Sequence, residues 1–239
     1  MDAAALAEHV KAGDVRAVSR LITLLENHEP DGRAALQQLE SVPRRAVTVG
    51  ITGYPGAGKS TLIDQLITAY RRQGKKVGII AVDTSSPRTG GAILGDRIRM
   101  QDHSLDRGVF IRSMATRGQH GGVAGSTKEA VRVLEAAGYD VILVETIGVG
   151  QDESDIGNVV KTVVAVVAPG LGDEIQAMKA GLFEVAHILV VNKADREGAD
   201  ATLRDLKAWH PRVLRVVALK GEGLPELVEA ISAHHGSEA

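Results

Sequence analysis

Cysteine is absent from the 239 residues of this sequence, and aromatic residues make up only 3% of them. The lack of cysteine excludes disulfides, thiolate metal sites and cysteine nucleophiles. Few aromatic side chains are available to stack on single-stranded nucleic acid, and a net charge of −2 attracts neither nucleic acid nor an anionic membrane surface. We therefore expect no nucleic acid and no membrane among the partners of this chain.

Long apolar runs are also lacking, since none approaches the length of a membrane span. The first residues contain neither the basic block nor the apolar block of a signal peptide, so we expect a cytoplasmic location. Apolar residues make up 44% of the chain and charged residues 24%, which is typical of a globular protein. The length is sufficient for one α/β domain with a substantial core and a small appendage.

A glycine-rich turn follows the apolar run Val47–Ile51 and fits the phosphate-binding pattern G-x-x-x-x-G-K-[ST]. Glycines let backbone N–H groups converge on phosphate oxygens, and the helix that follows directs its positive end to the same anion. An ordinary strand–turn–helix connection is the competing interpretation, but the strand and the amphipathic helix that the motif requires are both present. The nucleotide-binding residues predicted here are Gly53, Pro55, Gly56, Ala57, Gly58, Lys59, Ser60 and Thr61.

Two side chains of this motif have predicted chemical roles. Lys59 is expected to reach the β- and γ-phosphates as a catalytic residue, and the Ser60 hydroxyl is expected to ligate Mg²⁺. The sequence therefore predicts a nucleotide-binding protein that uses magnesium.

Short β-branched runs alternate with helical segments along the rest of the chain, at 77–82, 109–111, 141–144, 163–167, 188–191 and 213–217. Such runs indicate strands that are buried on both faces of a mostly parallel sheet. The predicted fold is α/β, a P-loop NTPase with a doubly wound sheet flanked by helices. We expect a helical N-terminal extension over residues 1–43 and a P-loop domain over residues 44–239. A last helix is expected over Leu224–Ala233, followed by a frayed tail.

Carboxylates follow two of the predicted strands, where ligands bind in parallel sheets. Asp83 ends the second strand and is the first choice for holding Mg²⁺ directly or through water, with Asp96 as the second choice; either could instead cap a helix or a turn. Glu145 ends the fourth strand and stands three residues before Gly148, as in the D-x-x-G pattern of GTPases but with Glu in place of Asp.

The pair Glu145 and Gly148 completes the predicted catalytic set. The carboxylate would lie in the second shell of the magnesium ion, and the Gly148 N–H would sense the γ-phosphate. No residue adjacent to Gly148 is a glutamine that could orient water, so we expect slow intrinsic hydrolysis.

The sixth strand ends in Asn192, Lys193, Ala194 and Asp195, which fit the guanine-recognition pattern N-K-x-D. The Asp195 carboxylate can accept hydrogen bonds from guanine N1–H and the exocyclic amine, two donors that adenine does not present together. Four residues alone are a weak signal, but at a strand end, in this order after a P-loop, they are a strong one. Ala218, Leu219 and Lys220 follow the last strand and are the predicted final base-contacting loop.

Together, these motifs resemble the MeaB/ArgK-like GTPases, the accessory G proteins of methylmalonyl-CoA mutase and related adenosylcobalamin-dependent mutases. The resemblance covers nearly the whole chain, and the pattern E-T-x-G-V-G-Q is narrower than generic GTPase signals. The segments that carry it are Gly53–Ser60, Asp83–Pro87, Gly95–Arg97, Glu145–Gln151, Pro169–Asp173 and Asn192–Asp195.

The resemblance implies a GTP-hydrolysing chaperone that binds GTP, GDP and Mg²⁺, gates delivery of the B12 cofactor to the mutase and protects the mutase. A cobalamin adenosyltransferase is a further candidate partner. By match to the family motifs, Asp83, Asp96 and Glu145 fall on the metal-site carboxylates. The family's mobile switch segments contain Arg99, Asp173 and Lys179. A homodimer stays open, because the usual C-terminal dimerisation arm would begin near the last residue of this sequence.

Three other functions are weighed against this one. A nickel-insertion GTPase shares the fold class, but it requires cysteine or histidine ligands, and the chain has no cysteine and no histidine cluster near the predicted switches. An ATP-dependent kinase linked to amino-acid transport is disfavoured by the guanine pattern. A GTP-binding scaffold that does not hydrolyse GTP stays open, since the expected intrinsic rate is slow.

Overall fold

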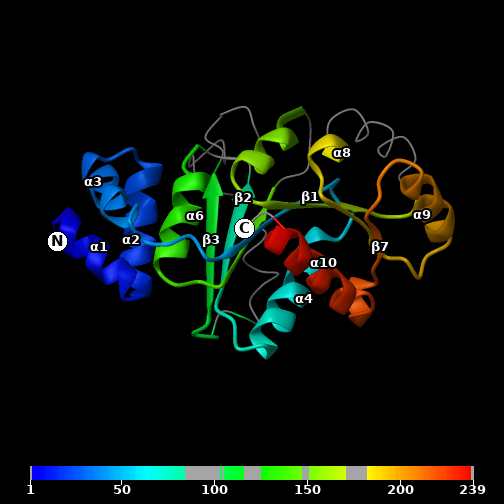
Figure 1. Ribbon diagram of the computed structural model, residues 1–239, viewed down its shortest axis with the longest axis horizontal. Helices are drawn as coiled ribbons and strands as arrows, with labels where there is room; N and C mark the ends of the chain where they lie inside the picture. The colour runs from blue at the N-terminus through cyan, green and yellow to red at the C-terminus, as the bar shows by residue number, and fades with distance from the viewer. Residues whose placement is uncertain are drawn as a thin grey trace.

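The computed structural model describes residues 2–83, 103, 105–115, 125–146, 151–170 and 182–237. Within them, seven parallel strands form one sheet in the order β3-β2-β4-β1-β5-β6-β7 (Figure 1). The strands are β1 (Val47–Thr52), β2 (Val77–Asp83), β3 (Val109–Ala115), β4 (Val141–Glu145), β5 (Thr162–Val167), β6 (Ile188–Val191) and β7 (Val213–Arg215). The parallel sheet predicted from the β-branched runs is confirmed.

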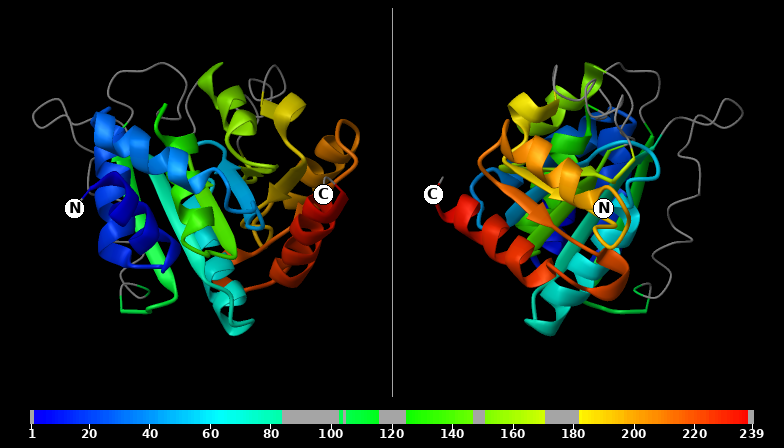
Figure 2. Two further views of the ribbon diagram at one scale, coloured as in Figure 1. Left: turned by 60° about the vertical axis from the view of Figure 1, so that its left-hand side comes forward. Right: turned by 90° about the vertical axis from the view of Figure 1, so that its right-hand side faces the viewer.

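Helices cover both faces of this sheet, as expected for a doubly wound fold (Figure 2). The α-helices are α1 (Ala3–Lys11), α2 (Val15–Glu26), α3 (Pro30–Leu39), α4 (Lys59–Arg72), α6 (Thr127–Ala136), α8 (Leu182–Val185), α9 (Ala199–Lys207) and α10 (Leu224–Ser237). The 3₁₀ helices within the described residues are η2 (Gln151–Asn158) and η3 (Ala218–Lys220). One face packs on α4 and α10, and the other packs on α6 and η2.

The N-terminal helices lie at one end of the molecule, outside α6 (Figure 1). Asp2 and Asp14 cap the first two of them, because their carboxylates accept backbone N–H groups at 2.7 and 2.8 Å. The apolar sides of these helices, including Leu21 and Leu25, share one buried cluster with α6 and the sheet. The boundary between residues 43 and 44 stays a prediction.

The C-terminal helix differs from the expected frayed tail. α10 continues to Ser237, and His234 is only 8% exposed. The His234 ring lies 4.2 Å from the His187 ring, and its Nδ1 lies 3.0 Å from Thr162 Oγ1. The expectation of a frayed tail was wrong because contacts with Thr162 and His187 bury His234. Histidine does not belong to the apolar residues whose spacing predicts a buried helix face. In the described part of the chain, no helix is long and apolar enough to cross a membrane.

Candidate nucleotide-binding site

The P-loop joins the carboxyl end of β1 to the first turn of α4, at the centre of the sheet. Gly53 has a φ of +133°, and a Cβ atom there would lie 2.1 Å from the Val166 carbonyl oxygen on β5. Gly58 has a φ of +93°, and a Cβ atom there would lie 2.4 Å from Asn192 Nδ2. Glycine is thus required at both positions by the backbone conformation and by the close neighbours.

Lys59 is the first residue of α4 and is only 8% exposed. Its ammonium donates to the carbonyl oxygens of Gly53 at 2.6 Å and of Tyr54 at 3.3 Å. These contacts hold the positive charge over the P-loop, where phosphate oxygens would gather. The phosphate-binding and catalytic role of this lysine stays a prediction.

Ser60 and Glu145 meet at the same end of the sheet. The Ser60 hydroxyl donates to Glu145 Oε1 at 2.9 Å, although 85 residues separate the two in sequence. Glu145 is 4% exposed and lies at the end of β4, beside β1. A hydroxyl and a carboxylate are thereby brought together next to the P-loop, and both are oxygen ligands of the kind that Mg²⁺ prefers.

Asn192 links two loops of the site. Its side chain is 2% exposed, and Nδ2 donates to the Ala57 carbonyl oxygen at 2.9 Å. Its Oδ1 accepts a hydrogen bond from the Ala218 N–H at 3.1 Å. The end of β6 is therefore fastened to the P-loop on one side and to η3 on the other. Sequence analysis assigned this asparagine to base recognition and did not anticipate the bridge.

Lys193 also contacts the P-loop, since its ammonium donates to the Gly56 carbonyl oxygen at 2.6 Å. Asp195 lies further out, with its side chain 41% exposed and its carboxylate 3.1 Å from the Lys220 ammonium. The hydrogen bond from Lys220 holds the pKa of Asp195 below its ordinary value of 3.8. The carboxylate therefore stays ionised at neutral pH, the state in which it can accept two hydrogen bonds from a base.

Arg215, at the end of β7, supports the segment Asn192–Asp195, which is predicted to recognise the base. Sequence analysis did not assign a role to this arginine. Its Nη2 donates to the Ala194 carbonyl oxygen at 2.5 Å, and its Nη1 donates to Asp200 Oδ1 at 2.6 Å. This guanidinium fixes the residue that lies between Lys193 and Asp195. Nothing in a single arginine at a strand end signals such a contact, because it depends on how β6 and β7 pair.

The other described residues of the P-loop and of η3 differ in exposure, and their contacts with a nucleotide stay predictions. Ala57 and Ala218 are buried beside Asn192, Pro55 and Gly56 are exposed, and Thr61 is half-buried on α4. Leu219, in η3, is 84% exposed, so it offers an apolar surface close to the segment Asn192–Asp195.

Several predicted residues cannot be compared with this geometry. Asp83 is the last residue of β2, but its side chain lies outside the description. The other predicted residues outside the described ranges are Asp96, Arg99, Gly148, Asp173 and Lys179. Within the described residues, no group of three His, Cys, Asp or Glu side chains is arranged to hold a metal ion.

A P-loop after the first strand of a parallel sheet and an N-K-x-D sequence after its sixth strand define the class of P-loop GTPases. The family model described as "Methylmalonyl Co-A mutase-associated GTPase MeaB" matches residues 18–238, and this chain belongs to that family. The chain is therefore a P-loop GTPase.

Relatives in three organisms agree with this assignment. A protein of Pyrococcus abyssi that carries a GTPase name is 53% identical over 242 residues, which cover 96% of this chain and 75% of the relative. The GTPase ArgK of Escherichia coli is 38% identical over 249 residues, covering 95% and 75%. The mitochondrial methylmalonic aciduria type A homolog of Mus musculus is 38% identical over 193 residues, covering 75% and 46%.

Solved structures support the fold. A crystal structure of a LAO/AO transport system kinase is similar at a TM-score of 0.72 with 29% identity, covering 98% of this chain and 75% of that one. The hydrogenase maturation factor HypB of Archaeoglobus fulgidus is similar at a TM-score of 0.60 with 22% identity, covering 90% and 97%. The second likeness concerns the fold alone, and together they confirm the predicted P-loop NTPase architecture.

Proposed function

We propose that this GTPase is a nucleotide-dependent switch that serves as a chaperone for an adenosylcobalamin-dependent acyl-CoA mutase of the methylmalonyl-CoA type. The main support is the match of residues 18–238 to a family of mutase-associated GTPases, and the Asn192 bridge joins the phosphate end of the site to the base end. The family description supplies the mutase as the class of partner. A cobalamin adenosyltransferase is proposed as a further partner, and the proposed site of action is the cytoplasm.

Magnesium is the metal proposed for this site. The Ser60 hydroxyl and the Glu145 carboxylate, 2.9 Å apart, offer the hard oxygen ligands that suit this ion. Ser60 would hold the ion and Glu145 would act through water, with Asp83 and Asp96 as further carboxylates. When bound, the ion would neutralise charge on the β- and γ-phosphates of GTP.

The side chains of this site mainly bind and orient the substrate. Lys59 is held in place by two P-loop carbonyl groups, so it loses little conformational freedom when phosphate binds. In the proposed reaction, the oxygen of water forms a bond to the γ-phosphorus. The bond between the γ-phosphorus and the β–γ bridging oxygen breaks, and GDP and phosphate are released. The Gly148 N–H is proposed to bind the γ-phosphate. Because no glutamine is adjacent to Gly148, we propose that the mutase accelerates a slow intrinsic reaction.

A binding experiment tests the chaperone role. The tagged chain is incubated with a candidate adenosylcobalamin-dependent mutase in GDP and, separately, in a non-hydrolysable GTP analogue. We expect the amount of captured mutase to differ between the two nucleotides, because a switch must bind its partner with state-dependent affinity. An absence of capture in both nucleotides would remove the mutase from the proposal and leave the GTPase assignment intact.

A nickel-insertion function is the second candidate, since HypB proteins share the fold. The sequence provides no thiolate ligand for it. Equilibrium dialysis against Ni²⁺ distinguishes the two functions, and the chaperone proposal expects no stoichiometric nickel binding.

A further inference from the structure

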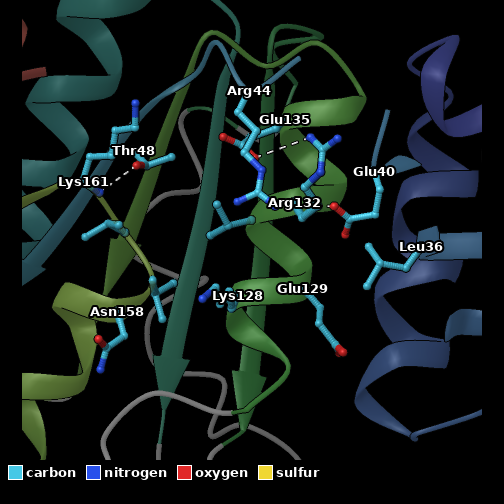
Figure 3. Close-up of a pocket in the computed structure, with 13 residues that line it drawn as sticks. Leu36, Glu40, Arg44, Thr48, Lys128, Glu129, Arg132, Glu135, Asn158 and Lys161 are labelled. Atoms are coloured by element: carbon cyan, nitrogen blue, oxygen red, sulfur yellow. Dashed lines mark hydrogen bonds and ion pairs between the residues drawn. The ribbon is translucent and has the colours of Figure 1, made fainter. Parts of the chain in front are cut away.

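A pocket of about 380 Å³ lies on the face of the sheet that carries α6. Figure 3 shows its walls, which come from α3, from α6 and from the segment that follows η2. Thr48, near the start of β1, lines this pocket, whereas the P-loop follows the other end of the same strand. The pocket is therefore separate from the nucleotide site.

Arg132 on α6 forms the inner wall of the pocket and is only 4% exposed. Its Nη2 donates to the carbonyl oxygens of Leu39 and Val42, the second at 2.6 Å. Its Nε and Nη1 make no hydrogen bond to the described part of the chain, although Nη1 lies 3.6 Å from Glu135 Oε2. Buried donors without an acceptor are unfavourable, so a ligand acceptor would gain a hydrogen bond if the guanidinium turned toward the pocket.

Glu135 lies beside Arg132 but does not accept a short hydrogen bond from its guanidinium. Burial raises the pKa of Glu135, and the nearby charge of Arg132 offsets that effect only in part. At 3.6 Å the ion pair lacks the short contact of a charge-assisted hydrogen bond.

Positive charge is in excess around the pocket, with four cationic and three anionic side chains among the residues that line it. Its two arginines each have a glutamate at 3.6 Å, as the pairs Arg44–Glu40 and Arg132–Glu135. Lys128 comes from α6 and Lys161 from the opposite wall, the segment between η2 and β5, and neither forms an ion pair within the described residues (Figure 3). An anion between these lysines would face two positive charges, of which that of Lys161 also acts on Glu135.

Part of the wall is apolar, formed by Leu36, Val131, Val159 and Val160. We propose that the pocket binds a small organic anion, a carboxylate on a short apolar chain. The carboxylate accepts hydrogen bonds from Arg132 and faces Lys128 and Lys161, and the chain contacts the valines. Charge and apolar surface thus select an amphiphilic acid over inorganic ions and neutral alcohols.

Titration with hexanoate tests this site in the full chain. The protein is saturated with GDP and Mg²⁺, so that the P-loop cannot bind the probe. Methyl NMR signals of Val131, Val159 and Val160 are followed, and hexanol serves as the uncharged probe of equal length. We expect one saturable hexanoate site at these methyl groups, and much weaker binding of hexanol.

Variants decide whether the charges carry the binding. The double substitution Lys128→Gln and Lys161→Gln should weaken hexanoate binding about tenfold or more, since two charge-assisted contacts are lost. The exposed Lys207→Gln on α9 is the matched control and should bind like the wild type. The proposal is overturned if the valine signals do not saturate, if hexanol binds equally well, or if the double variant keeps its affinity.

Discussion

At the scale of single residues, the buried Asn192 side chain joins the P-loop to η3. Replacing it with alanine removes the partners of the Ala57 carbonyl and the Ala218 N–H, both of which belong to buried residues. Each lost partner costs about 1–3 kcal/mol, so we expect the free energy of unfolding to fall by roughly 2–6 kcal/mol and GTP affinity to fall with it. Chemical denaturation and nucleotide titration measure the two effects.

The exposed Asn158→Ala is the matched control for this variant. It should change the free energy of unfolding by less than about 0.5 kcal/mol. A similar loss in both variants would mean that the bridge has no special role.

The same substitution, glycine to alanine, can be compared at two positions of the P-loop. Gly56→Ala introduces a side chain at a φ of +81° but meets no atom within 4 Å, so we expect a loss of about 1 kcal/mol. Gly53→Ala places its Cβ 2.1 Å from the Val166 carbonyl oxygen, so we expect a loss of roughly 3 kcal/mol and weakened phosphate binding. Equal stability of the two variants in thermal denaturation would contradict the described approach of β5 to the P-loop.

Asp195 is the residue on which base selectivity is predicted to depend. Asp195→Asn should weaken GTP binding and favour xanthine nucleotides, because xanthine presents a carbonyl where guanine has its amine. Competition between GTP and XTP measures the change, and the exposed Asp205→Asn on α9 is the control. Retention of the GTP preference in Asp195→Asn would refute the assigned base site.

At the scale of elements, α10 carries a cluster of histidines that makes stability depend on pH. Burial, Lys161 and His234 lower the pKa of His235 below its ordinary value of 6.5. The unfolded chain therefore binds a proton at a pH where the folded protein still keeps this imidazole neutral. Unfolding then takes up a proton, so the free energy of unfolding should decrease as the pH is lowered through 6.5.

Denaturation of the His235→Gln variant across this range measures the effect. We expect a flatter pH dependence than in the wild type, whereas the exposed His28→Asn should keep the wild-type slope. An unchanged slope in His235→Gln would show that another group titrates.

The same elements show what sequence could and could not predict. β1, α4 and the positions of the other strands along the chain were predicted because β-branched runs, a glycine-rich turn and an amphipathic helix are local signals, whereas the order of the strands in the sheet was not predicted. The last turn of α10 was not, since His234 is buried by contacts with Thr162 and His187, which are distant in sequence. The end of β7 at Arg215, rather than at residue 217, likewise depends on pairing with β6.

The site was predictable in its parts but not in its connections. The motifs identified Lys59, Ser60 and Asn192 one by one. Their hydrogen bonds to Tyr54, Glu145 and Ala218 depend on loops that only the folded sheet brings together. The carboxylates Asp83 and Asp96 stay predictions.

At the scale of the whole molecule, the sheet gathers the ends of β1, β4, β6 and β7 into one nucleotide site and leaves α1–α3 packed beyond α6. Membership of the MeaB family makes the chain a GTPase, and the proposed function adds a mutase that responds to the nucleotide. The two statements can be separated, because GTP turnover needs only this chain while its acceleration needs the partner.

The most direct measurement is phosphate release from GTP over many turnovers, by the full chain alone and with an adenosylcobalamin-dependent acyl-CoA mutase. The account predicts slow release by the chain alone and a clear acceleration by the mutase, with Lys59→Ala inactive in both cases. Turnover of GTP at one unchanged rate, with or without the mutase, would contradict the proposed partnership. No turnover under either condition would contradict the proposed switch itself.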